Sequence, residues 1–464
     1  MIALLPSDRS RLLAEFGATS RLALPLVLGQ LSAVGMNVID TMLAGHLSKH
    51  ALGAVAVGAS IWTLVLVSAI GIMMSLPPSV SQLHGAGRDS EIGPLFRQSL
   101  WLAIPLGCVL GLAVALLGPN LMLLTGVDPA LNDDVGLFLG AVAFGAPALT
   151  VFFALRGLSE GLGMTRPTMY FSMLGLILLG PIGYVLMYGH FGFAPRGVLG
   201  LGIATALVLW LQCFAFAIYV ARRQSYARLD LLARFDWPHW PTLAGLLHIG
   251  LPMGITLFME ASLFVAVALF IARLGTDIVA SHQIALNVAS VSFMVPLGIA
   301  MATTVRVGHA VGRGDYINVR HAGAVGLLLT LAVQLVSAGL MFSLPIAIAT
   351  LYTRDPVVIA LAAQLLILAA MFQLSDGIQV AANGALRGLK DTRVPMFITA
   401  FAYWGVGIPV GWWLAFPLGL GARGMWMGLI AGLTMSAILL TTRFWRQLDR
   451  LTMAAADATS SSAA

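Results

Sequence analysis

Charged side chains are scarce in this chain of 464 residues. Asp, Glu, Lys and Arg together make up 9% of it, whereas soluble domains typically carry about 25%. Hydrophobic residues reach 59%, so a soluble protein of this length would lack the polar surface that water requires. The 50 glycines and 21 prolines fit a helical membrane protein, because neighbouring helices satisfy the backbone groups that such residues free. Composition therefore excludes a soluble domain and favours a protein embedded in a lipid bilayer.

Cysteine and lysine are nearly absent as well. The two cysteines, Cys108 and Cys213, lie inside apolar runs, and at this spacing they form neither a disulfide framework nor a zinc site. Neither lysine follows a glycine, so the G-K-[ST] core of a Walker A loop is missing and we expect no ATP hydrolysis. The net charge of +6 comes from scattered basic residues, which argues against nucleic-acid binding. We expect no bound cofactor.

Long apolar runs recur along the chain. A helix crosses the hydrocarbon core of a bilayer with roughly 20 apolar residues, and we count twelve such runs. The sequence therefore predicts an all-α polytopic membrane protein with twelve transmembrane helices, although residues 119–190 could be divided differently. The expected spans lie near residues 20–45, 52–76, 98–118, 137–156, 167–189, 200–221, 248–271, 279–303, 322–346, 357–386, 394–416 and 423–444.

The distribution of basic residues supports this span count. Cytoplasmic segments of membrane proteins carry an excess of Lys and Arg. If the N-terminus is cytoplasmic, only five of the 25 basic residues fall in outside loops, and the other 20 fall in cytoplasmic segments. A wrong span count would scramble this fourfold bias, so both termini are expected to be cytoplasmic. The five outside residues are Lys49, Arg196, Arg273, Arg354 and Arg423.

The two halves of the sequence match at an offset of 227 residues, the separation of Pro25 from Pro252. Each half would hold six helices, an even number, so both copies should enter the membrane from the same side. We expect two six-helix lobes related by a pseudo-two-fold axis along the membrane normal, a design suited to alternating access. The expected limits are residues 1–221 and 248–464, with a cytoplasmic linker at 222–247. Further matches at this offset pair Gly71 with Gly298, Gly85 with Gly312, Asp128 with Asp355, Thr165 with Thr392 and Arg196 with Arg423.

Three acidic residues, Asp40, Glu260 and Asp376, lie well inside the expected spans. An ionised carboxylate inside a membrane is costly and usually functional. No basic residue is expected deep inside a span, so each acid must be neutral, hold a cation or face water. A single buried acid often serves only as a hydrogen-bonding partner between helices, but three without basic partners favour a cation-handling site.

Polar residues accompany these acids at helical spacing. Carboxylate, amide and hydroxyl oxygens are the ligands that a hard cation needs, whereas a protonated carboxyl needs only hydrogen-bond partners, so Na⁺ and H⁺ both stay open. Met36 and Met259 could line an adaptable apolar cavity. The accompanying residues are Asn37 before Asp40, Thr256 before Glu260, Gln379 and Asn383 after Asp376, and the pair Gln283 and Asn287 in the eighth span.

One motif points to a different class of function. Residues 157–161 match the G-x-S-x-G pattern of hydrolases, which needs a strand before the serine and a helix after it. Here the pattern ends an expected membrane helix, and no embedded histidine faces Ser159. We interpret it as a chance match and do not expect an enzyme.

Several stretches resemble the multidrug and toxic compound extrusion (MATE) transporters, most closely their NorM-type branch. These stretches cover residues 154–167 (ALRGLSEGLGMTRP), 275–315 and 375–395 (SDGIQVAANGALRGLKDTRVP), with VIDTMLAG (38–45) and PMGITLFME (252–260) in the first and seventh helices. The resemblance implies two lobes around a V-shaped cavity. It also implies export of lipophilic, often cationic drugs and dyes in exchange for Na⁺ or H⁺, by a monomer in the bacterial inner membrane.

The resemblance also implies roles for individual residues. Asp40, Glu260 and Asp376 fall on the family's membrane carboxylates, and Gln283 and Asn287 fall on its polar eighth-helix positions. A Na⁺ ion would therefore be held at Glu260 and Asp376.

Two positions depart from the family pattern. Relatives often carry Asn-x-Pro-x-Asn in the fifth helix, where this chain has Leu179 and Gly183 in place of the two asparagines. Asp40 therefore keeps only Asn37 nearby, which puts a first-lobe ion site in doubt. Some relatives have a tyrosine at the position of Phe372, and the lost hydroxyl slightly favours coupling to protons.

A flippase for lipid-linked precursors, from the same superfamily, is the alternative function. Such transporters tend to have basic cavities that meet anionic head groups. The expected spans of this chain hold acids and no embedded base, which argues against that alternative.

The charge distribution generates a topological prediction. Single cysteines introduced into the 222–240 linker, for example by Ser225→Cys, should be shielded from impermeant thiol reagents in intact cells, because the linker is expected to be cytoplasmic. The measurement is labelling before and after permeabilisation. Labelling from outside would overturn the twelve-span topology.

Overall fold

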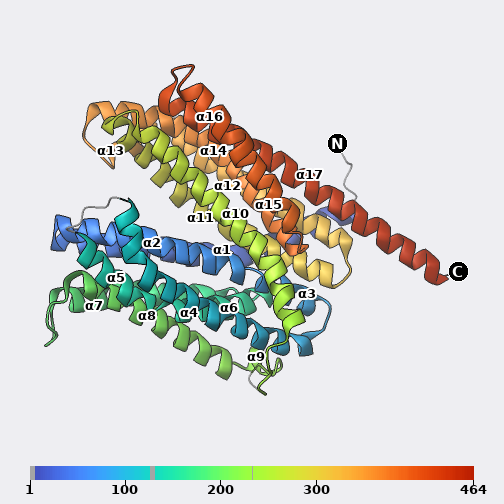
Figure 1. Ribbon diagram of the computed structural model, residues 1–464. Coiled ribbons are helices and arrows are strands. Elements are labelled where there is room, and N and C mark those ends of the chain that lie inside the picture. The colour runs from blue at the N-terminus through green and yellow to red at the C-terminus, as the bar shows by residue number, and fades with distance from the viewer. Residues whose placement is uncertain (1–5, 126–130, 232–233, 464) are drawn as a thin grey trace. The chain divides into compact units, whose positions relative to one another are not determined.

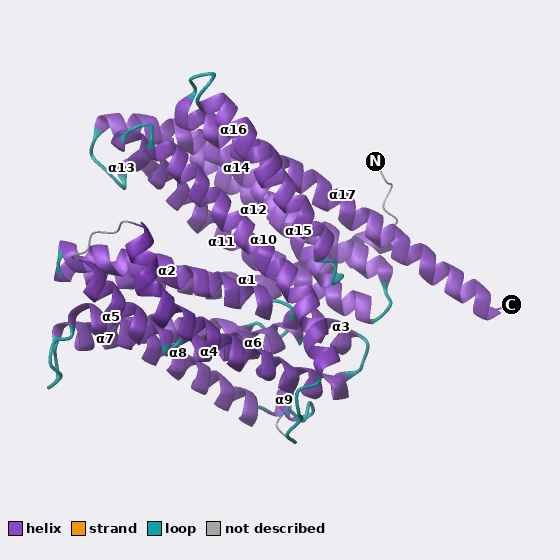
Figure 2. Cartoon of the chain, viewed as in Figure 1, coloured by secondary structure: helices purple, strands orange, loops and turns teal. Residues whose placement is uncertain are grey.

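The computed structural model describes residues 6–125, 131–231 and 234–463, and within these ranges it contains helices, turns and loops without a strand (Figure 2). Among the described residues, eleven helical segments are long and apolar enough to cross a membrane. A bent pair, α5 (Asn132–Ala143) and α6 (Ala146–Gly161), meets at 44° and makes twelve if it counts as one span. The expected all-α polytopic fold is confirmed. The sequence match at Asp128 lies outside the described residues.

The chain forms two compact units, which divide inside helices rather than at the expected limits of the lobes. We call residues Leu28–Gly254 the N-terminal unit, and the chain up to Val27 together with the chain from Ile255 onward the C-terminal unit. The two boundaries, after Val27 and after Gly254, are 227 residues apart, which is the offset of the sequence repeat. They fall within α1 (Pro6–Leu47) and α10 (Trp240–Ala272). Each of these helices therefore begins in one unit and ends in the other.

The N-terminal unit is built around α6, which packs against α2, α3, α4, α7 and α8 of its own repeat. Its core contains small and branched apolar side chains with a few aromatic rings, including the fully buried Leu158 and Phe216. The helices of this unit besides α1, α5, α6 and α10 are α2 (Lys49–Met73), α3 (Leu76–Gly85), η1 (Asp89–Glu91), α4 (Ile92–Thr125), α7 (Arg166–Tyr188), α8 (Gly197–Arg222) and α9 (Gln224–Ala227) (Figure 1).

The C-terminal unit is built around α14 (Pro356–Gly388), which packs against α11, α12, α13 and α17. Asp355 caps α14 by accepting a hydrogen bond from the Val357 backbone N–H at 2.8 Å, and Pro356 occupies the first helical position, where it costs no hydrogen bond. The other helices of this unit are α11 (Thr276–Gly312), α12 (Tyr316–Ser343), α13 (Pro345–Thr350), α15 (Arg393–Ala400), the π-helical η3 (Phe401–Gly407), α16 (Ile408–Ala415) and α17 (Gly421–Ala463) (Figure 1).

Glycines let the first helix of each repeat approach a neighbour backbone to backbone. In the N-terminal unit, a Cβ atom added to Gly71 of α2 would overlap the Cα atom of Gly254 in α10. In the C-terminal unit, a Cβ on Gly298 of α11 would lie 2.9 Å from the backbone nitrogen of Val27 in α1. Both pairs obey the repeat offset, so the same crossing is made once in each unit. Close approach through small residues is how membrane helices pack, because lipid offers no hydrophobic drive.

This crossing generates a test that contrasts two glycines. Gly71→Ala should lower the melting temperature of the purified protein, because the added methyl group overlaps backbone and overpacking costs roughly 1–3 kcal/mol. Gly254→Ala is the matched control, since its Cβ would lie 3.7 Å from Gly71 Cα, an ordinary contact. Equal melting temperatures for the two variants in detergent would contradict the crossing.

Candidate functional site

Glu260 and Asp376 come together in the C-terminal unit, each within electrostatic reach of the other. Glu260 lies in the second half of α10 and is half-buried, whereas Asp376 lies near the middle of α14 and is 4% exposed. A carboxylate at such a position loses most of its hydration, and only nearby opposite charge or hydrogen bonds can replace it. Two of the predicted site residues are thus neighbours in space, although 116 residues separate them in the sequence.

A buried arginine, Arg387, lies within electrostatic reach of Glu260, at the end of a span and not deep inside it. Arg387 was expected in a cytoplasmic segment, but the structure places it in the last turn of α14, where it is 6% exposed. Its charge interacts with that of Glu260. Its Nε–H also donates to the backbone carbonyl of Asn383 at 3.3 Å. The sequence contained the signal, because Arg387 follows Asn383 at i+4 and extends the same polar stripe.

The rest of this stripe matches the prediction from helical spacing. Gln379 is 1% exposed, and its Oε1 atom has no hydrogen-bond partner among the described residues. Asn383 is half-buried. On α10, Thr256 lies one turn before Glu260 and is 6% exposed. Met259 directly precedes Glu260 and is half-buried. Polar oxygens therefore lie along both helices that carry the acids.

Other buried acids in the described ranges each have an arginine of their own. Glu15 pairs with Arg306 at 2.5 Å, and Glu160 pairs with Arg156 at 2.6 Å. By contrast, neither Glu260 nor Asp376 makes a direct ion pair within the described part of the chain. The charge of Arg387 reaches Glu260, whereas Asp376 lies eleven residues before Arg387 on α14.

An aromatic cluster lies one turn before Asp376 on α14. Phe372, one turn before Asp376 on α14, packs edge-on against Trp426 with ring centroids 5.7 Å apart. The indole N–H of Trp426 donates to Nδ1 of His282 at 3.2 Å. The neutral imidazole therefore carries its proton on Nε2, which is buried and unpartnered among the described residues. The position of Phe372 supplies no oxygen to the site, as its sequence indicated.

Tyr403 is a further member of the site that the sequence reasoning missed. It lies in the π-helical segment η3, is fully buried, and is within electrostatic reach of both Glu260 and Asp376. No spacing rule points to it, because it comes from a separate helix and its neighbours in sequence are apolar.

Gln283 and Asn287 are not part of the buried stripe. Both are exposed on α11, and the Asn287 side-chain oxygen accepts a hydrogen bond from the Tyr352 hydroxyl at 2.9 Å. The buried polar residue at this level of α11 is His282, the direct neighbour of Gln283. A role for the two amides in cation binding remains a prediction.

Asp40 belongs to the N-terminal unit and has a sparser environment. It is half-buried, and its Oδ1 atom is buried without a hydrogen-bond partner among the described residues. Asn37, one turn earlier, is exposed, while Met36 packs against the apolar cluster around Leu179. A Cβ on Gly183 would meet only apolar side chains, those of Leu43, Leu201 and Ala204. The fifth-helix positions therefore offer Asp40 no amide.

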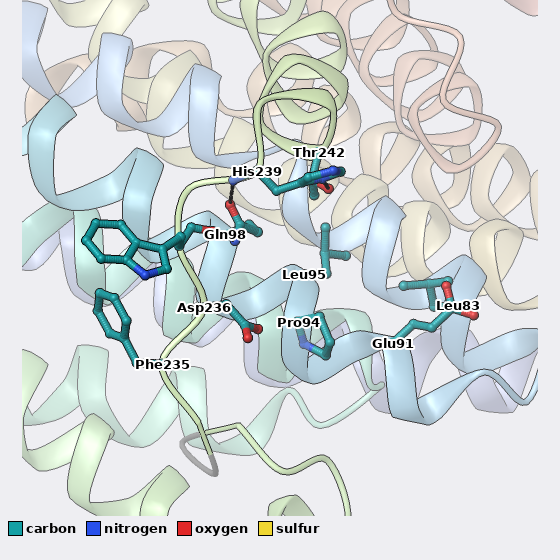
Figure 3. A pocket seen from close by; sticks show the side chains of 10 residues that line it. Leu83, Glu91, Pro94, Leu95, Gln98, Phe235, Asp236, His239 and Thr242 are labelled. Carbon is teal, nitrogen blue, oxygen red and sulfur yellow. Dashed lines mark hydrogen bonds between the residues drawn. The ribbon is translucent and has the colours of Figure 1, made fainter.

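The N-terminal unit also contains a pocket of about 560 Å³ beside the linker (Figure 3). Arg97 and Gln98 of α4 hold the linker against the helix, and Arg97 pairs with Asp236 at 2.6 Å. The Gln98 side chain accepts a hydrogen bond from the His239 backbone N–H at 2.7 Å (Figure 3). The two acids in its wall, Glu91 and Asp236, are both paired with arginines. Because these charges are compensated, the pocket is a weaker candidate for binding a cation than the Glu260 and Asp376 site.

Ser159 shows no sign of nucleophilic chemistry. It lies in α6 rather than on a turn between a strand and a helix, and it is fully buried. Its hydroxyl donates to the Leu155 carbonyl at 2.9 Å and lies 2.9 Å from the Tyr226 hydroxyl. The local structure supports reading the hydrolase pattern as a chance match.

Comparisons with known proteins agree on one family. The MatE family matches the chain twice, over residues 25–185 and 252–413, and the two matches begin 227 residues apart. A probable multidrug resistance protein NorM of Xanthomonas campestris pv. campestris is 50% identical over 452 residues, covering 97% of this chain and 98% of the relative. Multidrug resistance protein PmpM of Pseudomonas aeruginosa is 42% identical over 468 residues, covering 98% of each.

Solved structures agree with the fold. The outward-facing conformation of a multidrug resistance MATE family transporter of the MOP superfamily aligns with a TM-score of 0.87 at 19% identity, covering 95% of this chain and 97% of that one. The eukaryotic MATE transporter AtDTX14 aligns with a TM-score of 0.84, also at 19% identity, covering 95% and 100%.

Proposed function

Because this chain belongs to the MatE family, we propose that it is a secondary active multidrug efflux antiporter. It exports lipophilic, often cationic drugs and dyes in exchange for Na⁺ or H⁺ by alternating access. Relatives named multidrug resistance proteins match this chain over nearly their whole length, and their names support the class of function. The chain is a multi-pass membrane protein, and we place it in a bacterial inner membrane.

The observation that carries the coupling step is the charge count of the site in the C-terminal unit. Two carboxylates, Glu260 and Asp376, lie within electrostatic reach of each other, and the Arg387 guanidinium lies within electrostatic reach of Glu260. Two nearby carboxylates do not both ionise cheaply in a low dielectric, and a cation or a shared proton relieves their repulsion. One monovalent cation neutralises the remaining charge. We therefore expect one Na⁺ or one H⁺ to bind at this pair.

Exchange requires that the ion and the drug prefer different conformations. A ligand shifts a conformational equilibrium only through its differential affinity for the two states. A cationic drug competes for the same negative charge, directly or through a conformational change, and the resulting coupling free energy is reciprocal. Ion entry then favours drug release. Acidic groups in the wall of the pathway fit cationic substrates on electrostatic grounds.

The flippase alternative is less well supported. Arg387 supplies an embedded base that the sequence did not lead us to expect, and a base could contact an anionic head group. The two acids around it outnumber it, however, and its charge already interacts with that of Glu260. The net sign of the site therefore still favours cations.

Removing either carboxyl charge tests the proposal. Glu260→Gln and Asp376→Asn keep the side-chain shape, so both variants should express and insert normally. Both should lose gradient-driven export, and their binding of a lipophilic cation should no longer depend on Na⁺ or pH. The measurements are ethidium efflux and equilibrium ethidium binding, with Asp355→Asn as the matched control. Asp355 is an exposed helix cap on the same helix as Asp376, and asparagine caps equally well.

Wild-type gradient-driven efflux in both the Glu260→Gln and the Asp376→Asn variants would falsify coupling at this pair. Loss of efflux in the Asp355→Asn control as well would mean that the assay reports on folding rather than on charge.

Asp40 should behave differently, because it lies in the other unit and lacks amide partners. We expect Asp40→Asn to weaken efflux while leaving cation-dependent dye binding measurable, since the Glu260 and Asp376 pair is intact. The same two assays check this. If the substitution abolishes every cation dependence of binding, the assignment of the coupling ion to the C-terminal unit is wrong.

A further inference from the structure

The linker between α8 and α10 exposes three large aromatic rings within a few residues of one another. Phe235 is 70% exposed, Trp237 is 77% exposed and Trp240 is 70% exposed. Single exposed apolar side chains are ordinary, but a cluster of them on a folded surface usually marks an interaction site. The proposed efflux function gives these rings no role.

Hydrogen bonds from α4 fix the backbone that carries these rings. The Gln98 side chain donates to the Trp237 carbonyl at 2.8 Å and accepts from the His239 backbone N–H at 2.7 Å. The indole N–H of Trp101 donates to the Asp236 carbonyl at 2.9 Å. The backbone is therefore held in one conformation before any partner binds, and such preorganisation lowers the entropy lost on binding.

The linker crosses α4 where the charged part of the chain gives way to an apolar run. Arg97 directly precedes Gln98, and no charged residue follows it until after Gly118. This stretch belongs to a candidate membrane span, Asp89–Gly118. Because Gln98 binds the backbone of the linker at Trp237, the linker lies at the level where that apolar run begins.

The exposed rings continue a row of aromatic side chains that starts on α4. Phe235 packs edge-on against Trp101 with ring centroids 5.8 Å apart, and edge-on against Trp237 at 5.6 Å. Figure 3 shows Phe235 on the side of the linker opposite to Asp236, whose carboxylate turns toward α4 and pairs with Arg97. The row therefore leads from the start of the apolar run out to the linker.

The linker also carries an excess of positive charge. It contains four arginines against two aspartates, and one of these aspartates, Asp236, is already paired with Arg234 at 3.0 Å. The remaining three arginines are exposed and make no ion pair within the described part of the chain. They are Arg222, Arg223 and Arg228.

We propose that residues 222–240 form an interfacial anchor that binds the head groups of anionic phospholipids. Tryptophan is enriched at membrane–water interfaces, where its apolar ring and its polar N–H are both satisfied. Basic residues beside a membrane attract anionic lipids, and a guanidinium binds phosphate through paired hydrogen bonds. The position of the rings at the start of an apolar run favours a lipid surface over a protein partner. This inference goes beyond the proposed function and does not depend on it.

The depth of Trp237 tests the anchor. Full-length protein is reconstituted into vesicles of phosphatidylcholine and phosphatidylglycerol whose acyl chains carry bromine near the head groups or near the chain ends. Subtracting the fluorescence of the Trp237→Phe variant from that of the wild type isolates Trp237. We expect the shallow bromines to quench this emission more strongly than the deep ones.

Two outcomes of this measurement would overturn the proposal. Emission that no bromine quenches would place the ring in water and leave a protein partner as the occupant. Stronger quenching by the deep bromines would place the ring among the acyl chains, away from the head groups. The Trp237→Phe variant should melt as the wild type does, because the hydrogen bond from Gln98 goes to the backbone of residue 237.

Removing the three arginines tests the class of lipid. Purified protein in detergent is titrated with phosphatidylglycerol or phosphatidylcholine, and its melting temperature is followed. Phosphatidylglycerol should raise the melting temperature more, because a ligand of the folded state stabilises it. In the triple variant Arg222→Gln, Arg223→Gln and Arg228→Gln, the concentration for half of this rise should increase by about tenfold or more, since each basic residue near an anionic surface strengthens binding roughly fivefold.

The matched control removes the same charge from the other unit. The triple variant Arg320→Gln, Arg446→Gln and Arg450→Gln changes exposed arginines of α12 and α17, and it should keep the wild-type response to phosphatidylglycerol. Equal weakening in both triple variants would reduce the effect to total charge and remove the role of the linker. A wild-type protein that responds equally to both lipids, or equally to inorganic phosphate, would also overturn the proposal.

Discussion

Each of the two units depends on close backbone contact between helices at glycine residues, which have no side chain. In lipid, apolar surface gains nothing from leaving the solvent, so helix association relies on packing and on backbone approach at small residues. Gly71 with Gly254, and Gly298 with Val27, provide this approach once in each unit. The repeat offset of 227 residues relates both the crossings and the unit boundaries. The duplicated sequence therefore specifies a duplicated contact, not only a duplicated number of helices.

The site follows from the same packing. Because α14 packs against α11, α12 and α17, Asp376 and Arg387 are removed from lipid and from bulk water. An unpaired carboxylate there would need compensation, and the structure supplies one arginine for two acids. Glycines of α17 also let η3, which carries the buried Tyr403, pack closely against α17.

Hydropathy and the fixed offset predicted the class of fold and the repeat. The placement of Glu260 and Asp376 in one site was implied by the family resemblance, and their role in cation binding stays a prediction. Sequence reasoning placed Arg387 in the cytoplasmic segment just after the tenth expected span, and it did not foresee that this helix end is buried, since hydropathy alone cannot tell a helix end buried in protein from one in water. It missed Tyr403, whose place depends on a π-turn and on contacts between distant helices. It located the lobe boundaries between helices, whereas α1 and α10 each belong to both units.

A site with two acids and one base is suited to a transporter in a way that a balanced site is not. A carboxylate with its own arginine, such as Glu15 with Arg306, is already neutral and gains little from a passing cation. Two isolated acids would remain largely protonated and would respond to pH alone. Under the proposed function, Arg387 reduces the negative charge near Glu260, and a bound monovalent cation would neutralise the charge that the pair of acids keeps. The choice between ions would then depend on the neutral oxygens around the two acids.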